Sequence, residues 1–378
     1  MSWESISLSD ALRPLKSSPF TRDELNYSGG QYQNVHYGDI LVRFPSVVDA
    51  EKEGLPYVSD SAEGRCSRCS LLQNGDIIIA DTAEDEAVGK AIEIQGITDQ
   101  KVVSGLHTMA FRPQEGLFAP GFLGYFLNSS VYHNQLFPLM QGIKVLSISK
   151  TAIGDTVIKY PSYKEQEKIV ESLSGVDDII GALDEAIAKK RQIKEGLMRR
   201  LLTPQTGSKW VERLGRELFS IGNGRDYKSL GSGSIPVYGT GGLMASVDDY
   251  LYDGPTVCIG RKGTIDRPQF HEGKIWTVDT LFYTYDFKGV NPKFLYYLFC
   301  RVNWHALNEA TGVPSLTSNN ILNVCFLLPS EEEEQRSIVT ILDAVEDEIV
   351  ALDNKRQKYS LIKKGMMQEL LTGKTRLI

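Results

Sequence analysis

Residues 165–203 read EQEKIVESLSGVDDIIGALDEAIAKKRQIKEGLMRRLLT, and residues 334–372 read EQRSIVTILDAVEDEIVALDNKRQKYSLIKKGMMQELLT. The two stretches align without a gap, Glu165 with Glu334, and about half of their positions are identical. Self-similarity at a fixed offset is typical of an internal structural repeat. Each stretch follows a proline, Pro161 or Pro329, which blocks a helix from extending backwards. The sequence therefore predicts one long helix that is written twice.

Aliphatic residues recur along both stretches at steps of four and three, which is the a/d pattern of a coiled-coil seam. The predicted seam residues are Ile169, Leu173, Val176, Ile180 and Leu183 in the first copy and Ile338, Leu342, Val345, Ile349 and Leu352 in the second. At 1.5 Å per residue each helix would be about 60 Å long, and a lone helix of that length cannot bury its apolar stripe. The alternative is two ordinary amphipathic helices on separate cores. The matching seams favour a coiled coil between the copies.

The composition is that of a globular protein without a membrane span. A length of 378 residues suggests two or three domains, and 42% hydrophobic and 24% charged residues are ordinary values. No apolar run approaches 18 residues, and the start of the chain lacks the basic and apolar regions of a signal peptide. Five cysteines, an odd number, fit a reducing compartment. We therefore expect a cytoplasmic protein.

The repeat extends from the helices into two globular segments. Tyr125 and Leu146 in the first segment match Tyr297 and Leu316 in the second, and each segment mixes Gly-rich turns, short β-like runs and a helical patch. The predicted divisions are a first domain at residues 1–161, a first long helix at 162–204, a second domain at 205–329 and a second long helix at 330–378. Two long helices packed antiparallel would place the domains at opposite ends, related by a pseudo-two-fold. DNA-binding dimers set the spacing of their half-sites in the same way.

At this point the sequence resembles the specificity subunit of type I restriction–modification enzymes. The resemblance covers essentially the whole chain. It rests on the duplicated unit, on the Glu-Gln-x-x-Ile-Val openings and Leu-Leu-Thr endings of the helices, and on three motifs of the second domain. Those motifs are residues 235–242 (IPVYGTGG), 259–264 (IGRKGT) and 278–280 (VDT). The resemblance implies an α+β fold with two mixed α/β target recognition domains, joined by two long antiparallel helices that form a coiled coil with a pseudo-two-fold internal repeat.

The resemblance also implies a function and a set of partners. Each domain would read one half of a bipartite, asymmetric target in double-stranded DNA. The helices would fix the unread spacer and dock two methyltransferase subunits, and restriction and translocase subunits would join the full complex. The chain itself would hold no cofactor, so S-adenosylmethionine, ATP and Mg²⁺ are expected only on the partners. The alternative, from a different class, is a structural coiled-coil adaptor whose two domains bind proteins rather than DNA.

In the second domain, glycine-rich loops carry the candidate DNA contacts. Residues 260–264 place two glycines around adjacent cations and a hydroxyl, a combination that suits phosphate oxygens or a guanine edge. Two further loops, 222–228 and 238–242, have similar chemistry and read equally well as structural turns. The candidate residues in this domain are Arg225, Tyr227, Lys228, Tyr238, Thr240, Arg261, Lys262 and Thr264.

The first domain departs from this pattern, because its residues 80–86 (ADTAEDE) form an acidic loop where the second domain has the basic one. For its candidates a surface loop or a fold-specific turn is at least as good an interpretation. These weaker candidates are His36, Tyr37, Arg65, Arg68, Lys144 and Ser147.

No catalytic site is predicted. The chain has no phosphate-binding P-loop, no dinucleotide-binding glycine pattern, no His-Glu-x-x-His and no Gly-x-Ser-x-Gly. Cys66 and Cys69 form one close pair, whereas a structural zinc usually takes two, and the acidic run from Asp81 to Glu86 is expected to be solvated rather than to hold Mg²⁺. Three histidines among apolar and aromatic neighbours are predicted to be core or semi-buried: His107, His133 and His305.

Overall fold

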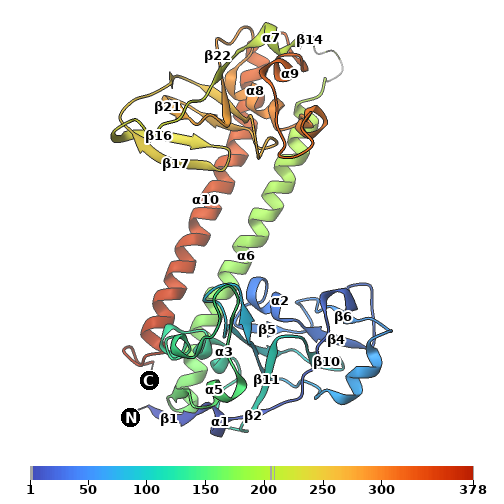
Figure 1. The fold of residues 1–378 in the computed structure, drawn as a ribbon, viewed down its shortest axis with the longest axis vertical. Coiled ribbons are helices and arrows are strands. Elements are labelled where there is room, and N and C mark those ends of the chain that lie inside the picture. The colour runs from blue at the N-terminus through green and yellow to red at the C-terminus, as the bar shows by residue number, and fades with distance from the viewer. Residues whose placement is uncertain (1–2, 205–206, 208, 378) are drawn as a thin grey trace. The chain divides into compact units, whose positions relative to one another are not determined.

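The computed structural model describes residues 3–204, 207 and 209–377, which form two compact units (Figure 1). Unit 1 consists of residues 1–183 and 355–378, and unit 2 of residues 184–354. Residue 205, where the second domain was predicted to begin, lies outside the described residues. The two predicted long helices are confirmed as α6 (Tyr163–Leu201) and α10 (Glu332–Leu370), each of 39 residues. Each helix gives one half to each unit.

Within each unit the two half-helices pair antiparallel. In unit 2, Lys190 pairs with Glu348 and Lys194 with Glu346, so the numbering rises along one helix as it falls along the other. The Lys194–Glu346 pair, at 2.5 Å, recurs in unit 1 at the equivalent positions as Lys363–Asp177, at 2.6 Å. The predicted antiparallel pairing is therefore present in both units.

Some of the predicted seam residues pack in the cores of the globules, and others lie outside those cores. Leu173 and Leu342 are fully buried, and with Ile169 and Ile338 they belong to the hydrophobic cores of the two globules. Val176, Leu183 and Ile349 are buried outside those cores, whereas Ile180, Val345 and Leu352 stay partly exposed. The first turns of each long helix are thus core elements of a globule, and so are the last, where Leu202 and Leu370 join the cores of units 2 and 1. Only the middle turns are left to the partner helix.

Unit 1 is built on a five-stranded sheet in the order β2-β11-β7-β9-β5. In β7, Ile77 and Ile79 face one core with helix α3, and Ile78 and Ala80 face a second core, as alternation along a strand requires. A four-stranded sheet, β10-β4-β6-β3, and the pairs β1-β13 and β12-β8 complete the strands. The strands are β1 (Glu4–Ser7), β2 (Leu12–Pro14), β3 (Leu25–Asn26), β4 (Tyr32–Val35), β5 (Val47–Asp49), β6 (Tyr57–Val58), β7 (Ile77–Ala80), β8 (Thr82–Ala83), β9 (Ala91–Gln95), β10 (Lys101–Ser104), β11 (Thr108–Pro113), β12 (Leu146–Ser147) and β13 (Val157–Tyr160). The helices are α1 (Leu8–Ala11), α2 (Tyr37–Val42), α3 (Phe122–Leu127), α4 (Ser130–His133) and α5 (Lys150–Gly154).

Unit 2 repeats part of this plan. Its sheets are ordered β15-β22-β19-β20 and β17-β16-β21-β18, with β14 paired to β23. The strands are β14 (Trp210–Leu214), β15 (Ser220–Asn223), β16 (Ser232–Gly239), β17 (Gly242–Val247), β18 (Tyr252–Asp253), β19 (Thr256–Gly260), β20 (Gln269–His271), β21 (Lys274–Thr277), β22 (Leu281–Tyr285) and β23 (Cys325–Pro329). The helices are α7 (Gly215–Leu218), α8 (Pro292–Phe299) and α9 (Ser318–Leu322). The antiparallel core β22-β19 corresponds to β11-β7, whereas the second sheets of the two units differ in topology.

The backbone corrects one predicted match. In unit 1 the amide of Ile148 donates to the carbonyl of Asp81, and in unit 2 the amide of Leu316 donates to the carbonyl of Arg261. The counterpart of Leu316 is therefore Ile148 and not Leu146. The reason is a longer loop in unit 1, where residues 141–147 form a small hairpin before the chain rejoins the common path.

A buried glutamine fixes the start of each long helix to its globule. The Nε2 of Gln335 donates to the carbonyls of Pro329 (3.0 Å) and Gly289 (3.1 Å), and its Oε1 accepts from the amide of Asn291 (2.7 Å). In unit 1, Gln166 makes the same three bonds to Pro161, Leu117 and Ala119. Both glutamines are at most 1% exposed. The Glu-Gln motif is thus explained by an amide that satisfies three backbone groups.

The C-terminal tail belongs to unit 1. Arg376 forms a two-pronged ion pair with Glu165, at 2.5 and 2.6 Å, and the Glu165 side chain is fully buried beneath it. Leu377 packs against the core of the same unit. The end of the chain therefore closes the globule that its first residues begin.

Candidate functional site

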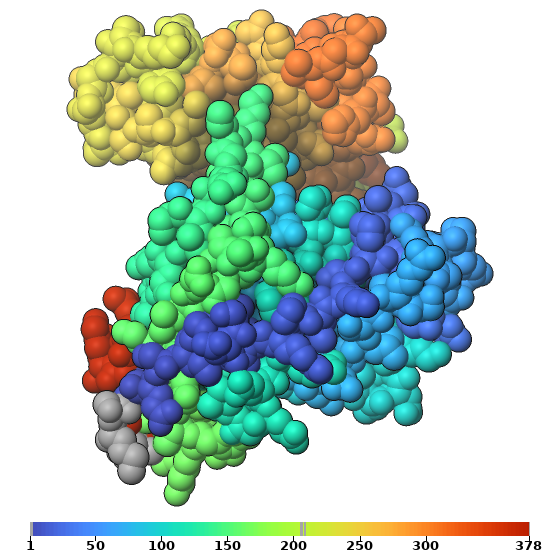
Figure 2. Space-filling model, turned by 60° about the horizontal axis from the view of Figure 1, so that its bottom comes forward, coloured from blue at the N-terminus to red at the C-terminus, as the bar shows by residue number. Residues whose placement is uncertain are grey.

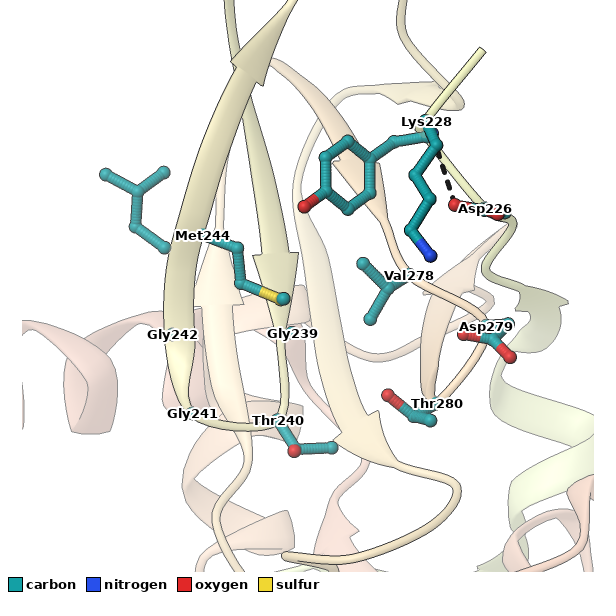
Figure 3. A pocket seen from close by; sticks show the side chains of 12 residues that line it. Asp226, Lys228, Gly239, Thr240, Gly241, Gly242, Met244, Val278, Asp279 and Thr280 are labelled. Carbon is teal, nitrogen blue, oxygen red and sulfur yellow. Dashed lines mark hydrogen bonds between the residues drawn. The ribbon is translucent and has the colours of Figure 1, made fainter. Parts of the chain in front are cut away.

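One hollow of unit 2 is an open cavity of about 610 Å³, lined by residues 226–228, 239–244 and 278–280 (Figure 3). Three predicted candidates, Tyr227, Lys228 and Thr240, line it. They come from the loop after β15 and from the β16–β17 hairpin, and the third wall is the loop between β21 and β22. The first and third of these segments, residues 226–228 and 278–280, are far apart in sequence and meet at one surface feature.

Close packing of backbone against backbone holds the first of these loops in place. A Cβ on Gly224 would lie 1.9 Å from the carbonyl oxygen of Val278, so only glycine fits there. The amide of Arg225 donates to Thr277 (2.8 Å), and the indole of Trp276 donates to the carbonyl of Arg225 (2.8 Å). The glycine serves packing, which leaves the exposed side chains of Arg225 and Lys228 to carry any contact with a ligand.

The cavity presents both hydrogen-bond donors and acceptors. Lys228 supplies an ammonium, while Asp226 and Asp279 supply carboxylates, and all three are exposed (Figure 3). The carboxylate of Asp226 already accepts from the amide of Lys228 at 3.1 Å. A mixed set of this kind suits the donor and acceptor pattern of a base edge better than a bare phosphate.

The basic loop lies beside the cavity. The amides of Arg261 and Lys262 donate to the carbonyl of Thr280, a cavity residue, at 2.8 and 3.3 Å. A Cβ on Gly263 would lie 4.0 Å from Oγ1 of Thr240. Arg261 and Lys262 are exposed, whereas Thr264 is half-buried. The structure therefore brings the basic loop together with Tyr227, Lys228 and Thr240, which the sequence could only name separately.

Tyr238 is placed differently from its predicted neighbours. Its ring stacks on His271, with centroids 3.7 Å apart, and packs against the small core of Cys258, Ile275 and Leu281. Burial lowers the pKa of the His271 imidazole to about 4, so the ring stays neutral at physiological pH. Tyr238 does not line the cavity, and its place in the fold is that of a packing residue.

The weaker candidates of unit 1 come from several different segments of the fold. Arg65 pairs with Glu24 and lies over the ring of Phe20, and Arg68 is exposed. His36 is 6% exposed and caps helix α2 by accepting from the amide of Gly38. Burial, assisted by the Arg22 guanidinium, lowers the pKa of the His36 imidazole.

Two further candidates lie in one projecting hairpin. The backbone of Ser147 pairs with that of Gln141 at 2.8 and 3.0 Å, and Lys144 is exposed in the turn between them. Ile143 in the same turn is 100% exposed and Val145 is 50% exposed. The green segment that includes this hairpin projects from the surface of unit 1 (Figure 2).

The prediction of buried histidines is wrong for two of the three. The rings of His107 and His305 are 45% and 57% exposed, and only His133, which bonds the carbonyl of Glu86 at 2.8 Å, is half-buried. The loop between β10 and β11 turns left-handed at His107, with φ of 52°, and this turn carries the ring away from the core. The sequence shows His107 near the apolar residues Leu106 and Met109, and it does not reveal this left-handed turn.

Metal ligation finds no support in the described part of the chain, where no group of three or more histidine, cysteine, aspartate or glutamate side chains could hold an ion. Cys66 and Cys69 are free thiols, and burial raises the pKa of Cys66 to about 11. Among the same residues, no helix is long and apolar enough to cross a membrane.

Comparison with known proteins supports the resemblance seen in the sequence. Residues 207–361 match the family described as "Type I restriction modification DNA specificity domain". Across 99% of its length the chain is 21% identical to the putative type I restriction enzyme MjaX specificity subunit of Methanocaldococcus jannaschii, 94% of which is covered. The MjaVIII specificity subunit of the same organism is 22% identical over 63% of this chain and 66% of its own. The predicted resemblance to type I specificity subunits is confirmed.

Solved structures agree on the fold. The type I restriction–modification S subunit of M. genitalium superposes with a TM-score of 0.64 at 14% identity, covering 98% of this chain and 96% of that one. A chain from a study of assembly and conformational transition in a type I restriction–modification system gives a TM-score of 0.56 at 16% identity, over 98% and 97%. The α+β fold with paired long helices is that of these subunits.

Proposed function

Because the chain resembles type I specificity subunits from end to end, we propose that it is the non-catalytic, DNA-reading subunit of such a system. Each unit reads one half of a bipartite, asymmetric target in double-stranded DNA. The observation that carries this proposal is that Lys228, Asp226 and Asp279 line one cavity of unit 2 and that the loop of Arg261 and Lys262 lies beside it. Donors and acceptors fixed on short loops are what direct readout of base edges requires.

The charge of the chain bears on how it holds DNA. With a net charge of −7, the chain as a whole repels the phosphate backbone. Phosphate contacts supply most non-specific affinity, so a partner must provide a large share of them. The proposed partners are two copies of one methyltransferase subunit, with restriction and translocase subunits in the full complex. S-adenosylmethionine, ATP and Mg²⁺ are used by those partners in the cytoplasm.

A duplicated groove supports two copies of one partner. In unit 2 a cavity of about 480 Å³ lies between α6 and the end of α8, and it is lined by Lys194 and Met198. In unit 1 a cavity of about 420 Å³ lies between α10 and α4, and it is lined by the equivalent Lys363 and Met367. Two grooves with the same framework fit two identical partners better than two different ones.

Beside each groove the long helix carries a glycine where no close contact within its own unit requires one. Gly196 and Gly365 occupy matching positions inside α6 and α10, and a Cβ at either would meet nothing within 4 Å. A glycine inside a helix costs roughly 1 kcal/mol relative to alanine. Next to them, Ile193 and Ile362 are 41% and 39% exposed. A bare backbone flanked by an exposed aliphatic side chain suits close packing of a partner helix.

Filling these positions should disrupt assembly. Replacing Gly196 and Gly365 together with glutamine adds bulk where the free chain has open space, so the fold should be kept. We expect association with the methyltransferase subunit to weaken by roughly tenfold or more, and either single variant to bind one copy instead of two, as measured by analytical ultracentrifugation. Gly181→Gln, at another open position of α6, is the matched control. Unchanged stoichiometry and affinity in the double variant would place the docking surface elsewhere.

The function itself is tested by genome-wide detection of methylated bases in cells with and without this gene. We expect one bipartite motif to disappear when the gene is removed and to return on complementation. Purified chain should bind that motif weakly alone and selectively with the methyltransferase. If the same motif is methylated in both strains, the proposal is wrong. A chain that leaves no DNA footprint with any partner would instead support the protein-binding adaptor.

A further inference from the structure

Unit 1 has a polar cluster that is fixed in place although it faces solvent. Oγ1 of Thr82 donates to Oδ1 of Asp81 at 2.7 Å, and Nδ1 of His107 lies 3.3 Å from each of those oxygens. The ring of Tyr37 meets the ring of His107 edge-on, with centroids 5.3 Å apart. The His107 side chain is 45% exposed and that of Asp81 28%. Two polar groups and an aromatic ring therefore hold an exposed imidazole in one orientation.

The backbone at His107 is in an uncommon conformation. Its φ of 52° lies in the left-handed region, which a residue other than glycine rarely adopts. The following Thr108 stabilises the turn, because its hydroxyl donates to the carbonyl of Gly105 at 2.6 Å. Strain of this kind is kept only where the surrounding structure enforces it, and it concentrates at functional sites. The ring that this backbone orients contacts Tyr37 edge-on and is 45% exposed.

The cluster stands where unit 2 has its basic loop. The amide of Asp81 donates to the carbonyl of His107 (3.1 Å), as the amide of Arg261 donates to that of Thr280 (2.8 Å). Thr82 pairs with Ser147, as Lys262 pairs with Ser315. Asp81 and Thr82 are therefore the counterparts of Arg261 and Lys262. The same position in the fold presents acceptors in unit 1 and donors in unit 2.

The projecting hairpin adjoins this cluster. Strand β12 of the hairpin pairs with β8, so that Ser147 lies opposite Thr82 and Leu146 opposite Ala83. The tip beyond it carries the exposed Lys144 between two exposed aliphatic residues. A cation and an apolar tip next to a polar cluster supply a phosphate contact and a surface that can enter a groove.

We propose that Asp81, Thr82 and His107 form the base-reading element of unit 1, and that they read a base edge presenting an amino group. A carboxylate only accepts hydrogen bonds, so Nδ1–H of His107 donates to Asp81, and the tautomer that carries its proton on Nδ1 presents Nε2 as an acceptor. In the major groove the amino donors are N6 of adenine and N4 of cytosine. This inference rests on the proposed function, since it assigns the chemistry of one of its two half-sites.

The test uses the full chain assembled with its methyltransferase subunit and a DNA library randomised in both half-sites, with methylated products sequenced. Asp81→Asn keeps the shape of the side chain but turns one acceptor into a donor. His107→Asn removes the ring while tolerating the left-handed backbone. We expect each variant to change the preferred base in one half-site by roughly tenfold or more in selectivity. The motif read by unit 2 should be unchanged.

Glu84→Gln is the matched control, because it removes the same charge from an exposed residue of the same loop that lies outside the cluster. Its motif should equal that of the wild type. If Asp81→Asn and His107→Asn methylate the wild-type motif with unchanged selectivity, the assignment of this cluster is overturned while the proposed function stands. If the wild-type assembly itself shows no sequence preference, the proposed function fails and the assignment fails with it.

Discussion

Replacing Arg261 with alanine is expected to weaken recognition of one half-site by roughly 10- to 100-fold, or about 1–3 kcal/mol. The guanidinium is exposed, its backbone is held by Thr280, and its loop adjoins the cavity of unit 2. An arginine that bonds two acceptors of a guanine leaves those acceptors unpaired when it is removed. The measurement is a binding competition between targets that differ in one half-site, using the chain with its proposed methyltransferase partner.

The control for this variant is the position-matched change in the other unit. Asp81→Asn should act on the opposite half-site. It should not change recognition of the half-site that Arg261→Ala weakens. Lys288→Ala, an exposed cation of unit 2 that pairs with Asp286, should have no effect on either half-site. Equal losses at both half-sites for Arg261→Ala would argue against two independent reading units.

Replacing Gln335 with alanine is expected to lower the free energy of unfolding of unit 2 by about 2–4 kcal/mol. The substitution leaves the carbonyls of Pro329 and Gly289 and the amide of Asn291 without their partner in a buried position. Each buried polar group left unpaired costs roughly 1–3 kcal/mol, and water entering the gap offsets part of the total. Urea denaturation followed by tryptophan fluorescence is suited to this unit, because it contains Trp210, Trp276 and Trp304.

Gln192→Ala is the matched control for Gln335→Ala. Gln192 is exposed on α6. Its replacement should therefore change the free energy of unfolding by less than about 0.5 kcal/mol. Gln166→Ala should reproduce the loss in unit 1, where the same three bonds are made. A Gln335→Ala protein as stable as the wild type would mean that the backbone groups find other partners.

The long helices were predictable because their evidence is local and repeated. A seam spaced by four and three residues, written twice, identifies both the helix and its partner without knowledge of the rest of the fold. The seam itself needed correction by the structure, since Leu173 and Leu342 belong to the globular cores. A heptad pattern reports that a side chain is buried and does not report what buries it.

The candidate site was predictable only in part. Glycine and charge patterns located the loops of Lys228, Thr240 and Arg261, but their meeting at one cavity depends on strand order, which the sequence does not display. Tyr238 was chosen for its glycine-rich setting, yet strand alternation turns its ring towards His271. His107 was predicted to be core or semi-buried from its apolar neighbours, and the left-handed backbone at this residue exposes its ring instead.

The tail contact of Arg376 with Glu165 has a consequence for the order in which the protein is made. Unit 2 is continuous in sequence, so every residue it needs has been synthesised by Asn354. Unit 1 starts first but needs residues 355–378, including the arginine that covers its buried glutamate. Domains generally fold as their residues leave the ribosome. In this chain unit 1 is therefore begun first and completed last. It remains incomplete while unit 2 is translated.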